Sequence, residues 1–203
     1  MDFREQLRQL ELERDLTTRA LKLSLLVTAA FRSAGYEMVI VGGSAIEFYT
    51  DGDYMSGDVD LCFRDRCRPE LRVISDIMSR FGATGSSVRT FKIAGLFVDV
   101  LGQVESLATT AFREIAGNSD EPGALIAKPE DLLPERLLMA TYPSRNDEAL
   151  ACAKKLAAAG LSGRVAIDWE ETSRVAALPE YRVEKELAQL LDCVKRDLSR
   201  DTP

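Results

Sequence analysis

The segment from Val39 to Phe63, VIVGGSAIEFYTDGDYMSGDVDLCF, contains polar and glycine residues that a hydrophobic core does not need. Gly42–Ser44 directly follows one short apolar run, and Asp58 and Asp60 stand one residue apart in the next. Each apolar run is short and continuous, as in a buried strand. The segment therefore predicts a strand, a glycine turn, a short helix and a second strand.

The glycine turn is suited to binding an anion. Gly42 and Gly43 let the backbone turn tightly and approach a ligand without a Cβ in the way. Ser44 would cap the following helix and offer a hydroxyl donor. Free N–H groups and a partial positive charge at a helix N-terminus favour phosphate. The alternative is that the glycines serve the geometry of the turn alone.

Asp58 and Asp60 are expected to share one face of their strand, because side chains alternate along a strand. Val59 and Leu61 would then face the core. Two adjacent carboxylates repel each other, and desolvating them is costly unless they share a cation. A divalent metal site explains the pair, and a solvated strand end is the alternative.

A third acid, Asp99, lies within the apolar stretch LFVDVLG. Burying an unpaired charge there would be expensive. Three aspartates on two neighbouring strands could hold two metal ions about 4 Å apart, as in phosphoryl and nucleotidyl transfer.

Composition limits the chemistry. The chain has 203 residues, is 46% hydrophobic and 29% charged, and carries a net charge of −7. It has no histidine, which excludes Ser-His-Asp and Cys-His catalysis and histidine-ligated metals. Carboxylates would therefore carry the chemistry, with Mg²⁺ as their natural cation. A nucleic-acid partner would require a local basic patch or a metal to offset the acidic charge.

The sequence predicts a cytoplasmic protein with no membrane contact. No apolar run approaches the roughly 20 residues of a membrane helix, and the charged N-terminus lacks a signal-peptide core. The cysteines show no paired ligand spacing, so free thiols are favoured over a zinc site. They are Cys62, Cys67, Cys152 and Cys193.

Two regions with different patterns follow one another along the chain. Residues 1–115 predict an α/β (α+β) core with an N-terminal helix over about 16–34, and residues 125–203 predict a helical domain of four or five helices. The stretch IAGNSDEPGALIA is the expected connection. Helix breaks are expected at Pro143, Gly160 and Pro179, and a capping box at Asp168 and Glu171.

A hairpin over residues 87–103 would bring a lysine to the aspartates. If it turns at Ala94-Gly95, Thr90 pairs with Asp99, and Lys92 lies on the same face. Lys92 could then contact a triphosphate, or its ammonium group could simply be solvated.

Further basic and aromatic residues have alternative interpretations. Three arginines after the second strand could attract a polynucleotide, or form a solvated loop balanced by Asp65 (Arg64, Arg66 and Arg68). Lys128 could face a cleft. Trp169 is favoured as a packing anchor over a base-stacking platform.

The order GGS, thirteen residues, DVD and a later VDV resembles the DNA-polymerase-β-like nucleotidyltransferase superfamily. The stretches VGGSAIEFY, SGDVDL and AKPEDLLPERLL are most similar to abortive-infection, toxin–antitoxin nucleotidyltransferases. The resemblance implies a mixed sheet flanked by helices. It also implies Mg²⁺-dependent transfer of an NMP from an NTP such as ATP to a hydroxyl, with release of pyrophosphate. The acceptor would be an RNA 3′ end, such as that of tRNA, or a protein.

The same resemblance assigns roles to residues. The nucleotide would be held by Gly42, Gly43 and Ser44, with Lys92 as a further contact. Asp58 and Asp60 would bind both metal ions, and Asp99 would complete the second site and act on the incoming hydroxyl. The helical half departs from the toxins, which carry an Arg-x-Lys-Asp-like stretch where this chain has SRND, with Asn146 in place of lysine.

Two other functions remain open at the level of sequence. The chain could be a non-catalytic or partner-modifying component of a toxin–antitoxin pair. It could also be a nucleotidyltransferase of the antibiotic-modifying kind, acting on a small molecule.

Overall fold

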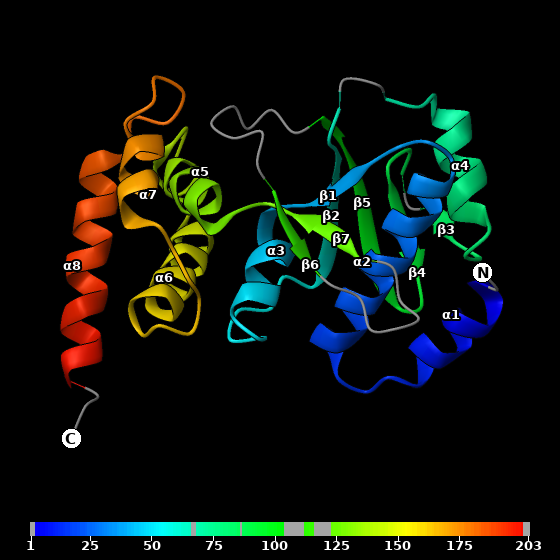
Figure 1. The fold of residues 1–203 in the computed structure, drawn as a ribbon, viewed down its shortest axis with the longest axis horizontal. Coiled ribbons are helices and arrows are strands. Elements are labelled where there is room, and N and C mark those ends of the chain that lie inside the picture. The colour runs from blue at the N-terminus through cyan, green and yellow to red at the C-terminus, as the bar shows by residue number, and fades with distance from the viewer. Residues whose placement is uncertain (1–2, 66–67, 86, 104–111, 116–122, 201–203) are drawn as a thin grey trace. The chain divides into compact units, whose positions relative to one another are not determined.

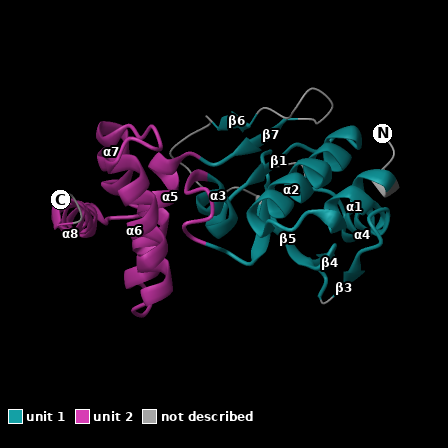
Figure 2. Ribbon diagram, turned by 90° about the horizontal axis from the view of Figure 1, so that it is seen from below, with its two compact units in different colours: residues 1–48, 55–105, 112–127 teal, residues 49–54, 106–111, 128–203 magenta. Residues whose placement is uncertain are grey.

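The computed structural model describes residues 3–65, 68–85, 87–103, 112–115 and 123–200 (Figure 1). Two compact units are present. Unit 1 comprises residues 1–48, 55–105 and 112–127, and unit 2 comprises 49–54, 106–111 and 128–203 (Figure 2). The chain thus enters unit 2 for six residues after residue 48 and returns to unit 1 at Met55.

Unit 1 is built on a mixed sheet of seven described strands in the order β3-β4-β5-β2-β1-β7-β6. The strands are β1 (Met38–Ile40), β2 (Asp58–Phe63), β3 (Thr84–Gly85), β4 (Thr90–Ile93), β5 (Leu96–Gln103), β6 (Arg113–Ile115) and β7 (Ala124–Ile126). Strand β2 pairs antiparallel with β1 and parallel with β5, and β1 pairs parallel with β7. The expected mixed α/β sheet with flanking helices is confirmed.

The helices associated with this sheet are α1 (Phe3–Leu12), α2 (Leu16–Ser33), α3 (Gly42–Tyr49) and α4 (Leu71–Ser79). Helix α2 packs against β1, β2, β7 and α4. It begins at Asp15, whose carboxylate accepts from Thr18 N, and Gly35 follows its end at φ +88°. The predicted helix over about 16–34 is therefore confirmed.

The predicted hairpin is also confirmed. Ala94 and Gly95 both have positive φ, and the strands they join pair Thr90 with Asp99 and Lys92 with Phe97. Two residues with positive φ form the type of turn that matches the twist of a two-stranded ribbon.

The predicted connection between the halves needs correction. Its end, Ala124–Ile126, is β7, which lies beside β1 within the sheet. The middle of the stretch, residues 116–122, lies outside the described residues.

Unit 2 is helical in its described part after residue 127. Its helices are α5 (Pro129–Thr141), α6 (Asp147–Leu161), α7 (Trp169–Ala176) and α8 (Glu184–Arg200). Helix α5 packs against α6, α7 and α8. The expected breaks at Pro143 and Pro179 are found between helices, whereas Gly160 lies inside α6. A Cβ at Gly160 would stand 2.4 Å from Ile167 Cδ1 and 2.9 Å from Trp169 Cζ2, so glycine is required by packing.

No helix among the described residues combines the length and the apolar character needed to cross a membrane.

Candidate functional site

Three carboxylates gather on one face of unit 1. Asp58 and Asp60 are on β2, and the parallel pairing of β2 with β5 places Asp99 directly beside Asp60. One carboxylate oxygen from each residue lies within 4.8 Å of the other two. The alternate residues Val59, Leu61, Val98 and Val100 are fully buried on the opposite face. The alternation expected from sequence therefore sets the direction of all three acids.

The Asp99 carboxylate suits a cation. Its Oδ1 atom is buried and accepts no hydrogen bond from the described residues. Buried polar atoms nearly always have a partner, and such an atom beside two further carboxylates is suited to a positively charged ligand. Oxygen ligands of this kind are those that Mg²⁺ and other hard divalent cations prefer. The residues present fit a divalent metal.

The local structure of the glycine turn differs from the one expected. Helix α3 begins at Gly42, whose φ of +64° lies in the left-handed region that favours glycine. Ser44 is therefore inside the first turn and does not cap the helix. Its buried hydroxyl donates to Val41 O at 3.0 Å and accepts from Asp60 N at 3.1 Å. Ser44 thus connects the turn to the strand that carries Asp60. To donate to a phosphate, its hydroxyl would have to give up the hydrogen bond to Val41 O.

A second connection to the carboxylates was missed by the sequence analysis. Glu47 of α3 is 3% exposed. It accepts from Thr17 Oγ1 at 2.8 Å and from Ser56 N at 2.8 Å. The Ser56 hydroxyl in turn donates to Asp58 Oδ1 at 2.6 Å. An acid within the apolar helix sequence SAIEFY was the available signal. This network fixes the residues immediately before β2 and so orients Asp58.

Lys92 shares the face of the carboxylates, and an aromatic residue lies between it and Asp58. Register places Lys92, Phe97 and Asp58 in one row across β4, β5 and β2. The Lys92 Nζ atom lies 5.9 Å from the centre of the Phe97 ring. Lys92 therefore lies on the predicted face of the sheet, the one that carries the three aspartates. Its contact with a nucleotide stays a prediction.

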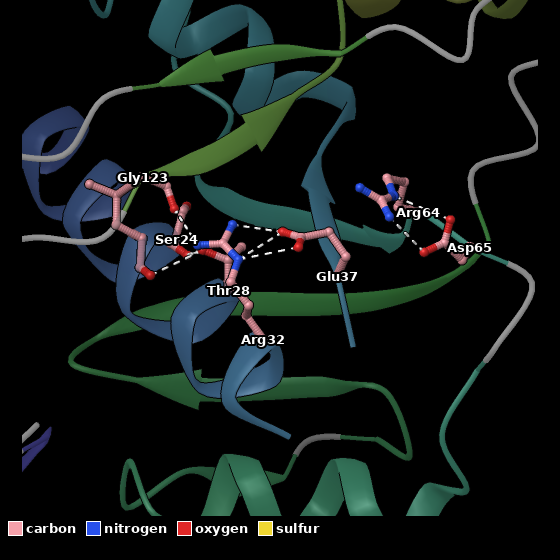
Figure 3. Close-up of polar contacts among 8 residues, drawn as sticks. Ser24, Thr28, Arg32, Glu37, Arg64, Asp65 and Gly123 are labelled. Atoms are coloured by element: carbon pink, nitrogen blue, oxygen red, sulfur yellow. Dashed lines mark hydrogen bonds and ion pairs between the residues drawn. The ribbon is translucent and has the colours of Figure 1, made fainter. Parts of the chain in front are cut away.

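The arginines after β2 lie at the other end of the strand from Asp58. Arg64 follows Phe63, so it lies about 20 Å along the chain from Asp58 at the rise of a β-strand. Its Nη2 lies 3.0 Å from Asp65 Oδ2. Figure 3 marks this ion pair with a dashed line. At Arg64 the structure therefore agrees with the alternative interpretation, a loop whose charge is balanced by Asp65. Arg66 lies outside the described residues, and Arg68 precedes α4.

Opposite charges also meet beside Arg64. Arg32, at the end of α2, donates to both carboxylate oxygens of Glu37 at 2.6–3.2 Å and to Gly123 O at 2.9 Å (Figure 3). These bonds join α2 to the residues that precede β1 and β7. They hold the sheet together at the end remote from the carboxylates.

In unit 2, the residues singled out from sequence have structural contacts. Asn146, where the toxins carry lysine, caps α6 by accepting from the N–H groups of Glu148 and Ala149. Arg145 pairs with Asp147 at 2.7 Å. Lys128 precedes α5, and its charge is one of the causes that lower the pKa of Glu171, after the hydrogen bond from Arg174. Trp169 packs over Gly160, as expected of an anchor.

The segment that enters unit 2 before β2 is attached there by side chains. Asp53 Oδ2 lies 2.6 Å from Arg164 Nη2. Tyr54 lies near Cys152, and burial is the main cause that raises the pKa of the Cys152 thiol to about 11 and that of Tyr54 to about 12. Cys152 is therefore a protonated packing residue at neutral pH. Cys62, Cys152 and Cys193 are free thiols, and Cys67 lies outside the described residues.

Comparison with solved structures places the fold. The antibiotic-resistance factor ANT(2'')-Ia in solution matches with a TM-score of 0.54 and 15% identity, over 85% of this chain and 96% of that one. The antigenic nucleotidyltransferase-like protein from Paracoccidioides brasiliensis matches with a TM-score of 0.53 and 14% identity, over 85% and 92%. The chain has the nucleotidyltransferase fold.

A crystal structure of ANT(2")-Ia in complex with adenylyl-2"-tobramycin also matches, with a TM-score of 0.50 and 13% identity, over 83% of this chain and 99% of that one. No protein-family model and no curated protein sequence matches the chain. Structural similarity at these identities shows the fold alone.

Proposed function

We propose that the chain is a metal-dependent nucleotidyltransferase that moves an NMP from an NTP to a hydroxyl acceptor. The observation that carries the proposal is the meeting of Asp58, Asp60 and Asp99 with a buried Asp99 oxygen that has no described hydrogen-bond partner. Carboxylates gathered in this way repel each other, and a cation bound between them would relieve that repulsion. The chain has the nucleotidyltransferase fold, and a cation at this position would serve nucleotidyl transfer.

The chain's own residues divide the reaction between them. Gly42 and Gly43 would present backbone N–H groups at the start of α3 to the phosphates of the NTP, with Ser44 beside them. The carboxylates of Asp58, Asp60 and Asp99 would hold two Mg²⁺ ions, which activate the attacking hydroxyl and stabilise the departing pyrophosphate. Lys92 on β4 would add a positive charge on the same face of the sheet.

The covalent step is a single displacement at the α-phosphorus. A bond forms between the acceptor oxygen and the α-phosphorus, and the bond from that phosphorus to the bridging oxygen of the β-phosphate breaks. Pyrophosphate leaves, and the hydroxyl proton passes to the carboxylate of Asp99. Glu47 and Ser56 take no part in the bonds but fix the direction of Asp58.

The acceptor defines two versions of the proposal. A macromolecular hydroxyl, at an RNA 3′ end or on a protein, follows from the resemblance to toxin–antitoxin nucleotidyltransferases. A small molecule is supported by the match to ANT(2")-Ia bound to adenylyl-2"-tobramycin.

The test is transfer of label from each α-³²P NTP, with Mg²⁺, to cellular RNA, to lysate protein or to an aminoglycoside. An Asp58→Ala/Asp60→Ala variant is the matched control. Label transferred by the wild type alone would support the proposal and identify the acceptor class. A folded protein that neither transfers label nor binds Mg²⁺·NTP by calorimetry would instead support a partner-binding component of a toxin–antitoxin pair.

A further inference from the structure

The order of the strands separates the two sides of the carboxylate site. Helix α3 starts directly after β1, and the order onward is β1, β2, β5, β4. Lys92 on β4 is therefore three strand spacings, about 14 Å, from β1, with the carboxylates of β2 and β5 between them. The start of α3 and Lys92 lie on opposite sides of the three acids.

In-line displacement assigns these sides to different substrates. The attacking and leaving oxygens stand opposite each other across the reacting phosphorus. If the triphosphate occupies the start of α3, as the proposed function has it, the acceptor approaches over β5 and β4. Lys92 then lies on the acceptor side, and we assign it to the acceptor instead of the triphosphate.

The acceptor side combines a cation, Lys92, with exposed apolar surface. No carboxylate among the described residues forms an ion pair with Lys92, and its Nζ atom lies 5.9 Å from the centre of the Phe97 ring. Phe97 is 42% exposed and Leu101, on the same face of β5, is 38% exposed. Asp99 is the only acidic residue in strands β3, β4 and β5.

This chemistry favours one class of acceptor. A polycationic sugar would meet Lys92 as a like charge, and Asp99 would be engaged with the metal. A single-stranded nucleic acid instead offers a base that can stack on an aromatic side chain and a phosphate that can pair with a cation. Phe97 also stands between Lys92 and Asp58, so the lysine is kept available for a ligand instead of pairing with the carboxylate.

We infer that Phe97 and Lys92 form the acceptor platform and that the acceptor is the 3′ end of a single-stranded nucleic acid. The terminal base stacks on Phe97, and the phosphate that precedes it pairs with Lys92. This inference rests on the proposed function and gives that function its substrate class.

The test measures binding of a short 5′-fluorescein-labelled single-stranded RNA by anisotropy, over a range of salt concentrations. Phe97→Ala is expected to weaken binding about ten-fold or more, and Phe97→Tyr to restore it, since stacking on an aromatic ring is worth about 1–3 kcal/mol per base. Phe97→Leu, which keeps apolar volume without a ring, is expected to remain weak. Lys92→Ala should reduce the slope of log Kd against log salt by about 0.7, the value for one phosphate of a single strand.

Two controls separate this inference from the proposed function. Leu71→Ala and Arg72→Ala remove an exposed apolar group and an exposed cation from α4, and both should bind RNA as the wild type does. Calorimetric binding of Mg²⁺·NTP should be unchanged in the Phe97 and Lys92 variants, because the nucleotide lies on the α3 side.

Each contrary result has a defined meaning. Normal Mg²⁺·NTP binding with no RNA binding, with equal RNA binding by every variant, or with faster transfer to an aminoglycoside than to RNA would overturn the acceptor platform and leave the proposed function standing. Loss of Mg²⁺·NTP binding in the Phe97 variant would assign the ring to the nucleotide base and overturn the inference as well. Failure of the wild type to bind Mg²⁺·NTP would overturn the proposed function itself.

Discussion

The two ends of strand β2 use charge in opposite ways. At the end that carries Asp58 and Asp60, like charges meet, with Asp99 beside them. At the end that leads to Arg64, opposite charges meet, as Arg64 with Asp65 and Arg32 with Glu37 (Figure 3). Opposite charges within ion-pair distance satisfy each other, whereas gathered carboxylates repel each other unless a cation binds between them. The difference separates the end proposed to bind a cation from the end whose charges pair within the chain.

The largest effect is expected from removing the like charges. Asp58→Ala/Asp60→Ala should reduce nucleotidyl transfer by about 1,000-fold or more, because two of the three proposed metal ligands are lost. The unfolding temperature of the metal-free protein should stay the same or rise, since a repulsion is removed. Activity is measured by label transfer, and stability by thermal unfolding in EDTA. A marked fall in the unfolding temperature would show that the carboxylates are structural.

Glu47→Gln tests whether the network behind Asp58 orients it. The two oxygens of Glu47 accept from Thr17 and from Ser56. An amide has one oxygen, and its NH2 group only donates, so one of these hydrogen bonds is lost and the residues before β2 should shift. Loss of a group that orients a metal ligand typically costs about 10–100-fold in metal affinity or activity. The expected result is weaker activation by Mg²⁺, measured as the concentration for half-maximal transfer.

Thr17→Val is the matched control for that network. It removes the bond to one Glu47 oxygen but leaves the bonds from Glu47 to Ser56 and from Ser56 to Asp58. The variant should keep the Mg²⁺ dependence of the wild type. Equal effects of the two substitutions would mean that Glu47 acts on stability alone.

Arg32→Ala tests the structural end. It removes the bonds to Glu37 and to Gly123 O, which join α2 to β1 and β7. Because the Arg32 side chain is 39% exposed, solvent screening limits the loss to about 1 kcal/mol of unfolding free energy. Urea unfolding measures the loss, and Mg²⁺ binding should be unchanged. A change in Mg²⁺ affinity would show that the two ends are coupled.

The smallest effect is expected at Arg64. Its partner Asp65 is next to it in sequence and largely exposed, so Arg64→Ala should cost about 0.5 kcal/mol or less. RNA binding, measured by the same anisotropy assay, should also be unchanged. Weaker RNA binding would restore the alternative that the arginines after β2 attract a polynucleotide.

The sequence predicted the elements whose signal is local. The bounds of β2, the alternation that sets its aspartates on one face and the hairpin that turns at Ala94-Gly95 all follow from short patterns of apolar residues and turn residues. The direction in which Asp58, Asp60 and Asp99 point could therefore be expected before the fold was known. Their roles in catalysis stay predictions.

What could not be predicted depends on partners distant in sequence. Strand β7 is three residues long and follows Pro122-Gly123, so its local sequence resembles a connection, and it is a strand because it pairs with β1 and β6. Glu47 finds Thr17 thirty residues away and Ser56 nine residues away. Ser44 was expected to cap α3, but the left-handed φ of Gly42 starts the helix two residues earlier.

The excursion of residues 49–54 into unit 2 has a consequence for how this protein can change over generations. The chain crosses between the units there and returns at Met55, three residues before Asp58. A single crossover in the gene that replaced residues 128 onward would leave Asp53 and Tyr54 without Arg164 and Cys152. Insertions between α3 and β2 would loosen Asp58 as well. We therefore expect the helical half to be inherited together with that loop.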